Sequence, residues 1–269
     1  MSCSLPAEIL DLIIDKLRDE SITLKECCLV SKSWIPRARS HLFANLRFNL
    51  NLLPHAAELW MMTFPDPPNS PAHHTRGLTI FSLPAITTTG ASVASWIRTF
   101  HNVVRLHFED TAWADHQAPF TPFYGFSHTV RSLRLTSTSF EVFDLVCSFP
   151  LLEDLALVSL LPEGGGAGWT APPTSPKLTG SLELSSAAEI RPAIRRLLDF
   201  RGGLRFAKIT VLFPGRDFGA ETDLVSGCSG TLESLTISSS VLGTLPPASL
   251  IGQYLTTPRG RRHVYGALP

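Results

Sequence analysis

A short leucine-bearing segment recurs through most of this 269-residue chain and constrains its fold more than any other feature. Seven such segments align on anchors spaced 28, 27, 22, 27, 27 and 26 residues apart, namely Leu78, Leu106, Leu133, Leu155, Leu182, Ile209 and Leu235. Apolar positions alternate with other residues in each segment, which predicts half-buried strands. A period of this size indicates stacked copies of one supersecondary unit, and stacking would bury the leucines in a continuous core.

Apolar residues at helical spacing predict a helix after several of these strands. The predicted helices are Ser92 to Phe100, Phe140 to Phe149 and Ile190 to Phe200, with a further short one from His55 to Phe64. One strand followed by one helix resembles the leucine-rich repeat, although the Asn or Cys ladder of that family is missing from the sequence. The resemblance implies an irregular, leucine-rich-repeat-like solenoid with a parallel sheet. An irregular α/β domain with a mainly parallel sheet fits the same alternation, and the narrow range of spacings favours the solenoid.

The first 48 residues have a different pattern, which predicts three short helices. The first of these carries one broad apolar stripe, formed by Ile9, Leu10, Ile13, Ile14 and Leu17. Asp11, Asp15 and Arg18 are predicted to form its polar back. Thr23 and Glu26 have the spacing of a capping box for a second helix, and Ser31 or Ser33 is expected to start the third. A unit this small is marginal alone, so its stripe needs either the rest of the chain or another protein.

These residues carry a resemblance to a known family. The pattern runs Leu5-Pro6-x-Glu8-Ile9-Leu10, then Cys28-Leu29-Val30-Ser31-Lys32-Ser33-Trp34, and ends at Leu42-Phe43. It resembles the F-box, especially that of fungal F-box proteins, over residues 4 to 48. The resemblance implies docking on a Skp-family adaptor, which joins a cullin scaffold in an SCF-type ubiquitin ligase. On the same basis the adaptor-binding residues are Leu5, Pro6, Glu8, Ile9, Ile13, Val30, Ser31 and Trp34. Periodicity leaves open a second interpretation, in which the apolar residues form only the core of a helical cap.

The expected function is that of a substrate-recognition subunit. The F-box would dock on the adaptor and the repeat body would hold a client protein, while the ubiquitin chemistry takes place on other subunits. An interaction scaffold without a degradative role is the alternative. An enzyme on an α/β body is less favoured, because the sequence has no G-x-S-x-G, H-E-x-x-H or Walker motif and no CxxC pair. We therefore predict no catalytic residue, no metal site and no cofactor.

Composition and local sequence add the remaining expectations. Charge is balanced at 23 basic and 23 acidic residues, so we expect no membrane partner and nucleic acid is disfavoured. The five cysteines lack the spacing of a disulfide framework, and a cytoplasmic or nuclear location, or both, is expected. The predicted organisation is an F-box at 1–48, a Pro-rich connector at 49–75, the repeat body at 76–255 and a flexible basic tail at 256–269. An aromatic insert at 114–126 is expected to pack over the edge of the body, with client contact as the alternative.

Overall fold

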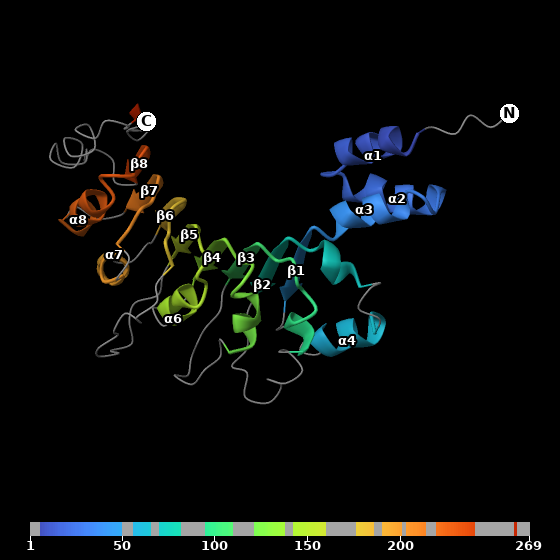
Figure 1. The fold of residues 1–269 in the computed structure, drawn as a ribbon, viewed down its shortest axis with the longest axis horizontal. Coiled ribbons are helices and arrows are strands. Elements are labelled where there is room, and N and C mark those ends of the chain that lie inside the picture. The colour runs from blue at the N-terminus through green and yellow to red at the C-terminus, as the bar shows by residue number, and fades with distance from the viewer. Residues whose placement is uncertain are drawn as a thin grey trace.

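A computed structural model shows a row of strands with a small group of helices at one end (Figure 1). It describes residues 6–49, 56–65, 70–81, 95–109, 121–137, 142–159, 176–185, 190–200, 203–213, 219–239 and 261–262. Most of the glycine-rich stretch from Leu161 to Pro176 and most of the basic tail lie outside these residues, as does Leu5. None of the described helices is long and apolar enough to cross a membrane.

The strands form one parallel sheet in which each strand pairs with the next one along the chain. They are β1 (Asn45–Asn49), β2 (Gly77–Phe81), β3 (Arg105–Glu109), β4 (Ser132–Thr136), β5 (Asp154–Val158), β6 (Ser181–Ser185), β7 (Lys208–Phe213), β8 (Ser234–Ser239) and β9 (Arg261–Arg262). All seven strands predicted from the leucine anchors are therefore confirmed, as β2 to β8. The parallel sheet of an α/β fold is confirmed as well, and its strands follow one another in chain order.

The pairing register places the predicted anchors side by side across the sheet. Leu78 pairs with Leu106, and the row continues through Leu133, Leu155, Leu182, Ile209 and Leu235. A second apolar row lies two residues further along each strand, and both rows are buried from β2 to β8. Side chains alternate between the two faces of a sheet, so the intervening residues lie on the opposite face. One face is thus apolar core and the other carries mostly polar side chains.

Helices cover the apolar face. Figure 1 shows α4 (Ala56–Thr63), α6 (Val142–Cys147), α7 (Arg191–Leu198) and α8 (Gly219–Gly227) on the outer side of the arc that the strands follow. Their apolar side chains, such as Phe143, Ile194 and Leu224, join the strand leucines in one core. The predicted helices at 55–64, 140–149 and 190–200 are confirmed as α4, α6 and α7. Residues 95–97 are helical within the predicted range 92–100, whereas α8 was not predicted.

Aromatic side chains close the core at its β1 end. Phe48 packs edge-on against Trp60, Trp96 and Phe100, with ring centroids 5.5, 4.8 and 6.2 Å apart. Such edge-to-face contacts add to the stabilisation that comes from burying the rings. Phe48 lies in β1 and Trp60 in α4, so the cluster ties the start of the sheet to the helix that follows it. The sheet therefore has a packed N-terminal end.

Two strands lie where the sequence predicts none. The predicted F-box range ends at residue 48, yet β1 begins at Asn45 and pairs with β2, so the sheet starts within that range. The predicted flexible tail includes Arg261 and Arg262, which pair with Ser234 and Leu235 as β9. In the aromatic insert, η3 (Thr121–Phe126) buries Phe123 and Phe126, and the Phe123 ring packs against Phe108. Their burial favours packing over client contact for these two rings.

The three N-terminal helices form as expected, but the second and third begin at other residues than predicted. They are α1 (Ala7–Lys16), α2 (Ser21–Val30) and α3 (Ile35–Leu42). The predicted capping box is wrong: α2 begins two residues before Thr23, whose hydroxyl donates to the Glu20 carboxylate at 3.1 Å. The third helix starts after Trp34 rather than at Ser31 or Ser33, because Pro36 fits the first turn, where its missing N–H is not needed.

We expect Leu155→Ala to lower the free energy of unfolding by about 2–5 kcal/mol, the usual cost of a large cavity in a packed core. Leu155 is fully buried between Leu133 and Leu182 on the neighbouring strands. Ser132→Ala, on the opposite face of β4, should change it by no more than about 0.5 kcal/mol. Urea unfolding of both variants checks this expectation, and equal effects would contradict the assignment of the two faces.

Candidate functional site

The N-terminal helices pack around a small core of their own. Ile14, Leu24, Cys27 and Ala38 are its buried residues, one or two from each helix, and they form a cluster separate from the core of the sheet. Leu17, Cys28, Trp34 and Leu42 are partly buried against it. We call residues 6–44 the head and the part of the chain from β1 onward the body. Four buried side chains give little hydrophobic stabilisation, so the head depends on further contacts.

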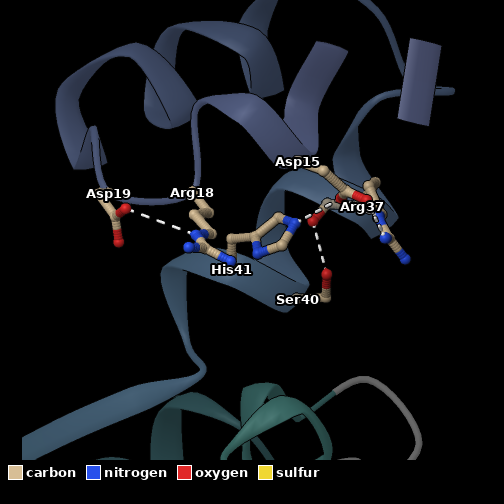
Figure 2. Close-up of polar contacts among 6 residues, drawn as sticks. All are labelled: Asp15, Arg18, Asp19, Arg37, Ser40 and His41. Carbon is tan, nitrogen blue, oxygen red and sulfur yellow. Dashed lines mark hydrogen bonds and ion pairs between the residues drawn. The ribbon is translucent and has the colours of Figure 1, made fainter. Parts of the chain in front are cut away.

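An ion-pair cluster supplies one of these contacts by joining α1 to α3 (Figure 2). Arg37 donates to both oxygens of the Asp15 carboxylate, with Nε 2.6 Å from Oδ1 and an outer nitrogen 2.5 Å from Oδ2. The His41 Nε2 atom lies 2.7 Å from the same Oδ1. Asp15, which the sequence places on the polar back of the first helix, is therefore paired rather than free in solvent. Its carboxylate faces α3, where a guanidinium fork can bind it through two bonds.

These hydrogen bonds change the ionisation of the carboxyl group. The bonds from Arg37, and then from His41, lower the pKa of Asp15 from 3.8 to about 2. The charged form is therefore favoured in the folded head. The neighbouring pair of Arg18 and Asp19 is more exposed and joins adjacent residues of one turn, so it does not link two helices (Figure 2).

The head also exposes large apolar side chains. We call Ile9, Leu12 and Ile13 of α1 and Ile22, Leu29 and Val30 of α2 the exposed head residues. Leu29 is 87% exposed and Ile22 is 72% exposed, so neither contributes to the head's own core. Single exposed apolar residues are normal on a protein surface, but six on two ten-residue helices make this part of the head a candidate binding surface.

The predicted adaptor-binding residues fall into three groups, which are exposed, half-buried and outside the described residues. Pro6, Glu8, Ile9, Ile13 and Val30 are exposed on or beside α1 and α2. Ser31 and Trp34 are half-buried: the Ser31 hydroxyl lies 2.9 Å from that of Ser33, and the Trp34 ring packs against the core of the head. Leu5 lies outside the described residues. Trp34 therefore supports the fold of the head in addition to any contact with a partner.

Three exposed head residues were not among the predicted contacts, namely Leu12, Ile22 and Leu29. Leu12 falls outside the apolar stripe on the helical wheel, so periodicity did not select it. Ile22 and Leu29 are seven residues apart on α2, which places them near the same face of that helix. This spacing could have identified the two residues from the sequence. The predicted capping box started the helix at Thr23, after Ile22, whereas α2 begins at Ser21, so Ile22 was not counted as part of the helix.

The head meets the body through α3 and leaves α1 and α2 farther from the sheet (Figure 1). The contact partner of α3 is η2 (Pro71–His74), and a cavity of about 190 Å³ lies between them, lined by Ile35, Pro36, Arg39, Phe43, Phe64, Ser70, Pro71 and His74. Burial, the neighbouring His73 and then Arg39 lower the pKa of His74. The neutral imidazole is thus favoured at this junction.

The described part of the chain offers little for catalysis. No three His, Cys, Asp or Glu side chains within it are grouped so that they could hold a metal ion. Burial raises the pKa of Cys147 to about 12 and that of Cys228 to about 11. Both thiols therefore stay protonated near neutral pH, which disfavours a nucleophilic role. The exposed head residues are the strongest candidate site, and their chemistry is that of a protein-binding surface.

Asp15→Asn should loosen α1 from α3, because the amide cannot replace the charged partner of Arg37 and His41. We expect faster hydrogen exchange of the α1 amides at neutral pH. Asp19→Asn, which alters a highly exposed carboxylate paired with Arg18 of the same turn, is the matched control and should leave that exchange unchanged.

The contacts of Asp15 with Arg37 and His41 also predict how acid changes the stability of the head. The folded pKa of Asp15 lies below its ordinary value of 3.8, so its stabilising contribution is complete above that pH. It is lost as the pH falls from 3.8 towards about 2. Wild-type protection of α1 should therefore fall across this interval more steeply than that of Asp15→Asn, and parallel curves for the two proteins would contradict the assignment.

No family model matches the chain, and neither a curated protein nor a solved structure does. The function is therefore argued from the residues and the geometry described above.

Proposed function

We propose that this protein is the substrate-recognition subunit of an SCF-type ubiquitin ligase. In this proposal the head is an F-box that docks on a Skp-family adaptor, and the adaptor connects it to a cullin. The body is a leucine-rich-repeat-like solenoid that binds a client protein. The observation that carries the proposal is the set of exposed head residues on α1 and α2.

The position of the head supports adaptor docking. An F-box sealed beneath the body could not reach another subunit, whereas Pro6, Ile9 and Ile13 are exposed and α3 makes the contact with η2. Covering six large apolar side chains would stabilise a complex by roughly 25 cal/mol for each Å² removed from water. The Asp15 pair holds α1 against α3, so these side chains are presented on a fixed arrangement of helices.

The order of the strands supports a repeat body. Each leucine-bearing strand is followed in the sheet by the next strand along the chain, as stacked repeats require. Such stacking leaves one long face of parallel strands without helices (Figure 1). A face of this kind can hold an extended or folded client.

In this function the chain itself performs no bond-making step. Binding both the adaptor and the client keeps client lysines close to the enzyme that transfers ubiquitin, which raises their effective concentration there. The separate cores of head and body suit this division, because each part can keep its structure while it binds a different partner.

We expect Ile9→Asp together with Leu29→Asp to abolish co-purification with a Skp-family adaptor. Both side chains are exposed, so the substitutions place two carboxylates in the proposed interface without removing core contacts. Met62→Asp on α4, a similarly exposed apolar residue outside the head, is the matched control and should leave co-purification unchanged.

Trp34→Ala is a less specific test, since this ring also packs on the core of the head. Adaptor binding by the Ile9 and Leu29 double variant at the wild-type level would exclude these helices as the docking surface. If the adaptor binds, a client that accumulates when the gene is deleted supports a degradative role. A bound client at an unchanged level supports a scaffold instead.

A further inference from the structure

The cavity at the junction of head and body has a chemical character that the proposed function does not use. On the head side its wall comes from α3, where Ile35 and Arg39 lie four residues apart and therefore share one face of the helix. Arg37 and His41 lie on the opposite side of α3, where they bind Asp15 of α1 (Figure 2). The side of α3 that faces the cavity is thus separate from the ion-pair cluster of the head.

The body supplies the other wall of the cavity, which consists of Phe64, Ser70, Pro71 and His74. The Phe64 ring is itself held in place by Trp60 of α4, with ring centroids 4.8 Å apart. Two backbone hydrogen bonds fix the walls relative to each other. In these bonds the amides of residues 76 and 77, just after η2, donate to the carbonyl of Ala44, just after α3, at 2.8 and 2.9 Å. The cavity therefore has a defined shape.

The polar side chains that line the cavity are suited to bind an acceptor. Arg39 has no ion-pair partner among the residues that the structure describes, and a guanidinium donates hydrogen bonds but cannot accept them. The buried Ser70 oxygen accepts from the Ala72 amide at 3.3 Å, which leaves its hydroxyl hydrogen free to donate. His74 is the third polar side chain, and no acidic residue is among the described residues of the lining. This set favours an anionic ligand.

The rest of the lining is apolar, and the volume limits the size of the ligand. The apolar side chains are those of Ile35, Pro36, Phe43, Phe64 and Pro71. A cavity of about 150 Å³ with apolar walls holds one benzene molecule. The volume here is about 190 Å³, which accommodates one ring of that size and a small charged substituent.

We propose that this cavity binds a small monocarboxylate whose apolar part is a single ring. The carboxylate lies between Arg39 and His74, where the guanidinium fork can donate two hydrogen bonds to it, and the ring lies against Phe43 and Phe64. Arg39 and Phe43 belong to the head and the other two residues to the body, so the ligand joins the two parts. The site goes beyond the proposed function, and its test requires neither an adaptor nor a client.

A titration of the full-length protein with benzoate, followed by the NMR signals of the ligand, tests the proposal. Benzamide has nearly the same shape without the charge, and acetate keeps the charge without the ring. We expect benzoate to bind at least about tenfold more tightly than either control. Benzamide lacks the charge-assisted hydrogen bonds to Arg39, and acetate lacks the apolar surface that the cavity would bury.

Single substitutions locate the site. Arg39→Gln should weaken benzoate binding at least about tenfold, because the amide lacks both the charge and the fork of the guanidinium. Arg205→Gln removes an exposed arginine just before β7, near the other end of the sheet (Figure 1), and should alter binding no more than about twofold. Thermal unfolding checks that the variants are folded, and His74→Gln repeats the test if Arg39→Gln is not.

The His74 imidazole gives a second readout that depends on where the carboxylate lies. In the free protein burial lowers its pKa, followed by His73, whose ring lies 6.0 Å from that of His101, and by Arg39 of α3. A carboxylate beside the imidazole favours its charged form, so benzoate should raise the pKa of His74 and bind more tightly as the pH falls. NMR of the imidazole protons against pH measures this shift, and benzamide should leave it unchanged.

Four results would overturn the proposal. They are the absence of benzoate binding, binding of benzamide or acetate as tight as that of benzoate, equal losses in Arg39→Gln and Arg205→Gln, and an unchanged pKa of His74. Inorganic phosphate is the competing probe. If it bound more tightly than benzoate, the cavity would be a site for small inorganic anions and the monocarboxylate assignment would be wrong.

Discussion

The parallel pairing of each strand with its successor is the constraint on which the rest of the body depends. The register aligns Leu133, Leu155 and Leu182, so each buried side chain has an apolar neighbour on both sides. A slip of one residue at any pair would move a whole strand's leucines to the polar face. The same register places Arg134, Ala156 and Glu183 in line on that face, so the core and the surface charge pattern are fixed together.

The head is stabilised differently from the body. Its own core is small, and a carboxylate bound by Arg37 and His41 helps to hold its helices together. Its helices leave Ile22, Leu29 and Val30 largely exposed, whereas the strands of the body bury their apolar rows. Under the proposed function, a second polypeptide covers these side chains. That difference between the two parts supports assigning adaptor docking to the head and client binding to the body.

Much of the body could be predicted because its signal repeats. Seven anchors with similar spacing identify β2 to β8, even though single segments such as Leu78 to Ile80 are too short to be convincing alone. The sequence did not predict β1, because no earlier repeat precedes it and it follows three helices directly. The sequence did not predict β9 either, because two arginines show no alternation of apolar and polar residues. Their pairing with Ser234 and Leu235 depends on the tertiary structure. α8 begins at a glycine and has only a weak apolar stripe.

The head was predictable in outline but not in its contacts. Helical periodicity located α1, yet it cannot say which apolar residues face the core: Ile14 is buried while Ile13 beside it is exposed. The role of Asp15 depends on where α3 lies, which a helical wheel does not contain. The capping signal at Thr23 was overridden by a start at Ser21, and this hid the common face of Ile22 and Leu29.

Hydrogen exchange of the full chain, measured with and without a Skp-family adaptor, tests the central claim most directly. If the exposed head residues form the docking surface, the adaptor will slow exchange along α1 and α2 and leave the amides of β2 to β8 unchanged. Slowed exchange confined to the sheet, or no change anywhere, would contradict the assignment of the head as the adaptor-binding part.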